Sequence, residues 1–163
     1  MILGMTLFQF KVLHTALSVM GILTGLLVLS RMVRMRPLGA SNTIFLWTTI
    51  LTSVTGFFFP FTAFGPAHYL GVISLVVMAA ATAALYIGSL YGTWRPIYVV
   101  SCAIGLYFNI FVGVIMVFAK IPELNRYAPT GKEPTLIVTE IVALLVVALL
   151  GWLALRRFHP AGM

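Results

Sequence analysis

The sequence contains no aspartate and only three glutamates, and charged residues make up 8% of its 163 positions. A typical soluble domain carries about 25% charged residues. Hydrophobic residues make up 61% of the chain. Because so few groups could be solvated on a compact surface, the composition excludes an ordinary soluble domain and predicts an integral membrane protein.

Cysteine is even scarcer than acidic residues. The single thiol, Cys102, cannot form an internal disulfide and excludes a two-thiol exchange enzyme. Without aspartate, two-aspartate intramembrane chemistry is excluded as well. The sequence also lacks a Gly-x-Ser-x-Gly elbow, a phosphate-binding loop and a His-Glu-x-x-His motif. We therefore predict no catalytic residue, and expect a protein that is not an enzyme.

Apolar residues are arranged in five long blocks, separated by short polar segments. A helix needs about 20 residues to cross a bilayer core, and each block is close to that length. The predicted spans are residues 7–30, 42–61, 67–91, 96–120 and 134–155. The expected fold class is all-α: one transmembrane bundle over residues 1–163.

Basic residues stand mainly at the ends of these blocks, where they would meet lipid headgroups. With five spans, one side of the membrane receives Arg31, Arg34, Arg36, Arg95, Arg156 and Arg157. The other side receives Lys11, Lys120, Arg126 and Lys132. The side with more cations is expected to be cytoplasmic, which puts the N-terminus outside. No basic patch with interleaved aromatic residues is present, so nucleic acid is not an expected partner.

Small residues recur at helical spacing within the blocks, as expected where helices pack closely in lipid. The predicted packing positions are Ser18, Gly21, Gly25, Gly105, Gly113 and Gly151. In the second block, Thr48, Thr52 and Thr55 share one helical face.

Strongly polar residues within the blocks are few, and such residues mark a candidate site because they are costly in a membrane. The candidate ligand- or cofactor-binding residues are His14, His68, Asn109, Glu140 and Thr55. Most lie toward the outer ends of their blocks. The inner half is expected to be mainly apolar.

Three interpretations of these residues remain open. Glu140 could be a protonated group that fixes helix register through a hydrogen bond to His14 or Asn109. His14 and His68 could bind haem b or a metal ion in an electron-transfer subunit. Glu140 and His14 could also titrate in a small-solute or proton transporter.

The first prediction for function is an accessory or small-ligand-binding membrane component with a polar site in the outer half of the bundle. The outer loop, residues 121–133, has mixed charge and is expected to contact other membrane subunits.

Three stretches carry a resemblance to known proteins: residues 52–60 (TSVTGFFFP), 65–71 (GPAHYLG), and 108–111 (FNIF) running on to 120–130 (KIPELNRYAPT). Together they resemble a family of small multi-spanning proteins of the bacterial cytoplasmic membrane to which no activity is assigned. The resemblance implies that location and a shared bundle. The length and span number are also similar to those of the translocator-protein family, but the chain lacks that family's tryptophan-rich pattern.

Overall fold

The computed structural model describes residues 2–60 and 63–159, and each apolar block in this part of the chain contains a long helix. Its helices are α1 (Leu7–Val33), α2 (Ala40–Gly56), α3 (Pro66–Tyr86), α4 (Trp94–Lys120), α5 (Pro122–Asn125) and α6 (Pro134–Arg157). The all-α prediction is confirmed. As helices, however, the second and third blocks end at Gly56 and Tyr86, several residues earlier than expected.

Four of the helices, α1, α3, α4 and α6, are long and apolar enough to cross a membrane, which is compatible with an integral, multi-pass membrane protein. Helix α2 is shorter. Its 17 residues extend over about 25 Å at 1.5 Å per residue, less than the roughly 30 Å of a hydrocarbon core. Four candidate spans are therefore observed, and the fifth stays a prediction.

Local sequence signals explain where the helices begin. Thr6 and Gln9 form a capping box at the start of α1, in which each side chain accepts a hydrogen bond from the other residue's backbone N–H. Pro66 and Pro134 occupy the first turns of α3 and α6. Proline is favoured there because its missing N–H would have no helical partner.

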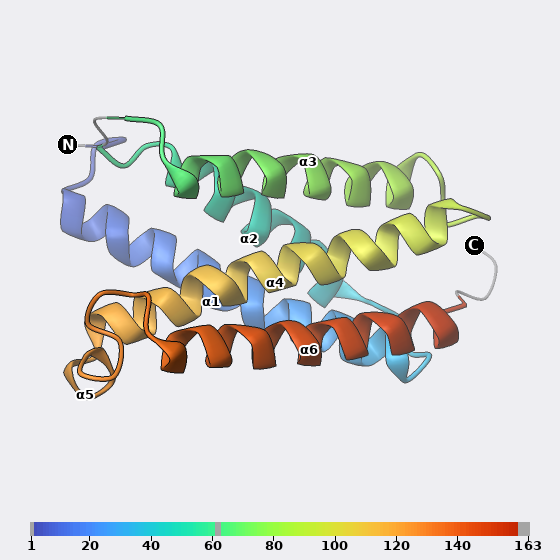
Figure 1. Cartoon of the computed structure of the whole chain (residues 1–163). Coiled ribbons are helices and arrows are strands. Elements are labelled where there is room, and N and C mark those ends of the chain that lie inside the picture. Colours follow the sequence, from blue (N-terminus) through green and yellow to red (C-terminus); the bar gives the residue numbers. More distant parts are fainter. Residues whose placement is uncertain (1, 61–62, 160–163) are drawn as a thin grey trace.

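Taken in chain order, α1, α2, α3, α4 and α6 alternate in direction, so the bundle has two distinct ends (Figure 1). We call one the arginine end; α1, α3 and α6 finish there, beside the segment 34–39. The other is the histidine end, where α1 starts and the segments 57–60 and 121–133 lie. Helix α4 contacts every other helix of the described chain and occupies the centre of the bundle.

The small residues of α1 let α2 and α4 approach its backbone closely. A Cβ atom built on Gly25 would lie 2.7 Å from the Phe45 ring and 2.9 Å from Leu106. Gly21 is similarly close to Asn109. The structure thus places both glycines at the contact between the first, second and fourth helices.

The other predicted packing positions are less tightly enclosed, with one exception. A Cβ on Gly105 would meet the side chain of Met78 in α3. A Cβ on Gly151 would lie 3.1 Å from Ala103, and one on Gly113 3.3 Å from Ile22. Ser18 is only half-buried.

Replacing Gly25 with alanine should destabilise the bundle by about 1–3 kcal/mol, because the new methyl group overlaps two fully buried side chains. The free energy of unfolding can be measured by titrating the purified protein in mixed micelles with a denaturing detergent. Gly56→Ala is the matched control, since its Cβ would meet no atom closer than 3.9 Å. Equal stabilities of the two variants would contradict close packing at Gly25.

Candidate functional site

Asn109 is buried near the middle of α4 and links three helices. Its Nδ2 donates a hydrogen bond of 3.0 Å to Oγ1 of Thr49 in α2. Gly21 of α1 provides the space, since a Cβ there would lie 2.9 Å from that nitrogen. This arrangement uses Asn109 as an interhelical contact. The bonded residue, Thr49, is next to Thr48 in the sequence but is not on the predicted threonine face.

His14 of α1 is bonded to Thr55 of α2, with 2.8 Å between Nδ1 and Oγ1. The Thr55 hydroxyl donates its hydrogen to the Leu51 carbonyl at 2.7 Å. With the hydroxyl hydrogen directed to the Leu51 carbonyl, Thr55 Oγ1 accepts from His14 Nδ1–H. In the neutral ring, Nε2 of His14 then keeps a lone pair with which it can accept a hydrogen bond or bind a cation.

His68 has a different environment, at the start of α3. Its Nδ1 accepts a hydrogen bond of 3.1 Å from the backbone N–H of Gly65, and its ring lies against Phe57 and Phe64. In a neutral ring with this bond, the proton is on Nε2, which leaves no free nitrogen for a metal. His68 therefore acts as a helix cap, and its geometry does not fit an axial haem ligand.

No group of three or more histidine, cysteine or acidic side chains in the described residues could hold a metal ion. The arrangement of His14 and His68 also gives no matched pair of free ring nitrogens. Binding of haem or a metal ion by His14 and His68 stays a prediction.

Glu140 of α6 is buried, and neither of its carboxyl oxygens has a hydrogen-bond partner among the described residues. The expected hydrogen bond to His14 or Asn109 is not formed, because those side chains bond to threonines of α2 instead.

Polar contacts are not confined to the histidine end. Near the arginine end, the buried hydroxyl of Tyr98 donates to Oδ1 of Asn42. Tyr98 lies one turn before Cys102, on the side of α4 that also carries Gly105 and Asn109. Helical spacing from these two residues back towards the start of the block would have found it.

The segment 121–133 folds against the histidine end of the bundle. Phe118, Ala128 and Leu136 form a small buried apolar cluster beneath it. Glu133 accepts hydrogen bonds from the backbone N–H of Thr130 at 2.9 Å and from its hydroxyl at 2.8 Å. The backbone bond from Thr130, followed by the hydroxyl bond, lowers the pKa of Glu133, so this loop is held by a carboxylate at neutral pH.

Two hollows on the described surface lie apart from the predicted polar site residues. One, of about 500 Å³, is an apolar groove between Ile50 of α2 and one face of α3. The other, of about 290 Å³, lies among arginines at the arginine end. Neither is lined by His14, Asn109 or Glu140, so these predicted polar residues do not border the two hollows.

No family model, curated protein or solved structure matches this chain. The resemblance noted from the sequence therefore stays a prediction.

The Tyr98–Asn42 bond should contribute measurably to stability. We expect Tyr98→Phe to lower the free energy of unfolding by about 1–3 kcal/mol, because it leaves a buried amide oxygen without its donor. Tyr86→Phe removes a hydroxyl from a side chain that is 63% exposed and should change stability by less than about 0.5 kcal/mol. The measurement is detergent-titrated unfolding, and a similar loss in both variants would argue against the interhelical bond.

Proposed function

We propose that this chain is a non-enzymatic, multi-pass membrane protein that binds a small ligand through Glu140. The supporting observation is that this carboxyl group is buried with both oxygens unpartnered in the described structure. A bound N–H donor or small cation would supply the missing partner.

The energetic cost of Glu140 supports a role in binding. A buried polar group without a hydrogen bond costs about 1–3 kcal/mol in proteins, and an unpaired charge costs more. Between Pro134 and Leu155, Glu140 is the single ionisable side chain in an otherwise apolar helix. If position 140 only had to pack between helices, leucine would fill it without the cost of burying a carboxyl group. Because Glu140 is only 8% exposed, the proposed ligand is a group of few atoms, such as an ammonium ion.

The proposed arrangement in the membrane has five crossings, with the arginine end in the cytoplasm and the N-terminus outside. Helix α2 is included as a crossing because it packs against α1, α3 and α4 and its buried face carries Asn42 and Thr49. Six arginines at one end, against four cations at the other, support this orientation. A bacterial cytoplasmic membrane is the proposed location.

Cysteine labelling tests this arrangement, because the natural Cys102 is fully buried. In intact cells, Ala63→Cys should react with an impermeant maleimide, and Pro37→Cys should react only after the membrane is opened. The two positions flank α2, so labelling of both from one side would show that α2 does not cross.

Ligand binding is tested with two variants of Glu140 and defined probes. In the wild-type protein, ammonium, methylammonium or guanidinium chloride should raise the unfolding temperature in a saturable manner, relative to sodium chloride at equal ionic strength. Glu140→Gln should keep the fold and lose the shift. Glu140→Leu should also lose it while raising the ligand-free stability by about 1–3 kcal/mol, because the unpartnered carboxyl group is gone.

Thr139→Val is the control, since it changes a neighbouring side chain whose hydroxyl bonds within α6. It should leave the probe response unchanged. If no probe stabilises the wild-type protein, or if Glu140→Gln responds like the wild type, Glu140 is not a binding group. A loss of stability in Glu140→Leu would instead point to an ordinary structural hydrogen bond.

A further inference from the structure

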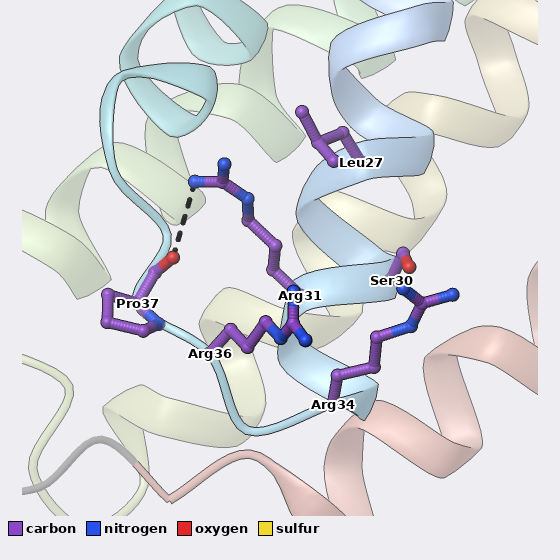
Figure 2. Close-up of a pocket in the computed structure, with 6 residues that line it drawn as sticks. All are labelled: Leu27, Ser30, Arg31, Arg34, Arg36 and Pro37. Carbon is purple, nitrogen blue, oxygen red and sulfur yellow. Dashed lines mark hydrogen bonds between the residues drawn. The ribbon is translucent and has the colours of Figure 1, made fainter.

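The arginine end of the bundle contains a pocket of about 290 Å³ between the last turns of α1 and the segment that leads to α2. It is lined by Leu27, Ser30, Arg31, Arg34, Arg36 and Pro37 (Figure 2). Three of these six side chains are cationic and none is acidic. The two acidic residues outside α6 are Glu123 and Glu133, and both lie in the segment 121–133 at the histidine end.

Backbone geometry fixes the shape of this pocket. The end of α1 forms a Schellman motif, in which the N–H of Arg36 donates to the Arg31 carbonyl at 2.9 Å and the N–H of Met35 donates to Met32 at 3.2 Å. Met35 takes the left-handed position of the motif, with φ of 53°. Glycine is the usual residue there, and a side chain at positive φ is strained. The turn is formed despite the strain at Met35, and Arg34 and Arg36 are the residues directly before and after Met35.

The three arginines of the pocket are not equivalent. Arg31 is held in the wall, because its guanidinium donates to the Leu38 carbonyl at 2.8 Å. It also donates to the Pro37 carbonyl at 3.4 Å, the bond drawn in Figure 2. For Arg34 and Arg36, no side-chain hydrogen bond or ion pair is recorded with any described residue, and both are exposed. Their guanidinium groups are therefore available to an anion from outside the protein.

The lining of the pocket also changes in polarity along α1. Leu27, 43% exposed, is followed one turn later by the hydroxyl of Ser30, and another turn later by Arg34. An apolar side chain, a hydroxyl and a guanidinium thus stand in the order in which a lipid presents its acyl chain, its glycerol region and its phosphate. A free phosphate ion would make no use of Leu27.

We infer that this pocket binds the headgroup phosphate of an anionic lipid. Arg34 and Arg36 would pair with the phosphate oxygens through charge-assisted hydrogen bonds. Ser30 would donate its hydroxyl to the same group, and Leu27 would contact the start of an acyl chain. The pocket is at the opposite end of the bundle from Glu140, so this inference does not depend on the proposed ligand site.

The experiment measures lipid binding to the full-length protein in neutral detergent, by native mass spectrometry and by thermal unfolding. Phosphatidylglycerol, zwitterionic phosphatidylcholine and inorganic phosphate serve as the probes. We expect saturable binding of phosphatidylglycerol, at least about tenfold tighter than that of phosphatidylcholine. The double variant Arg34→Gln/Arg36→Gln should weaken phosphatidylglycerol binding by about tenfold or more, because it removes both charged donors.

The matched control is Arg156→Gln/Arg157→Gln, which removes the same charge from the same end of the bundle but lies outside the pocket. It should change the affinity by less than about twofold. Equal weakening in the two double variants would overturn the site in favour of general surface attraction. Equal affinity for the two lipids would also overturn it. Inorganic phosphate binding as tightly as phosphatidylglycerol would replace the lipid with a free anion as the ligand.

Discussion

Close contact between α4 and its neighbours is the constraint on which the rest of the bundle depends. Helices in lipid gain little from hydrophobic burial against one another, so they rely on small residues and on hydrogen bonds between helices. Helix α4 provides both along one face. Tyr98 and Asn109 bond to α2, while Gly105 admits a side chain of α3. Because this face is continuous over three turns, the positions of α2 and α3 follow from it.

The polar residues enclosed by the helices fall into two classes. Asn109 and Tyr98 are fully explained by their partners, since each forms a bond that joins two helices. His68 is explained by the cap that it makes at Gly65. Glu140 has no such partner in the described chain, and this difference is what makes it the candidate for binding. A buried polar group without a hydrogen-bond partner is expected either to bind a ligand or to serve another function that offsets its energetic cost.

The arginines at the arginine end are similarly divided by what they contact. Arg95 donates to the Leu155 and Phe158 carbonyls at 3.0 and 2.6 Å, which caps the end of α6. Arg31 closes the turn between α1 and α2. Arg34 and Arg36 have no such structural contact, although all four contribute equally to the charge bias that predicts orientation. A count of cations along the sequence cannot separate these roles, because it does not include the carbonyl groups that the fold brings near.

The sequence alone indicated an all-α protein with helices long and apolar enough to cross a membrane. Low charge and long apolar blocks are properties of the sequence, and no packing arrangement changes them. The sequence also determined the approximate extent of the helices and the faces that carry Gly21, Gly25 and Asn109, since helical spacing fixes which residues share a side. Only the tertiary structure decided the partners. Asn109 bonds to Thr49, one residue from the predicted threonine face, and Glu140 bonds to neither expected residue. The reason is that interhelical contacts depend on the rotation and separation of two helices, and these are set by close packing at a few glycines.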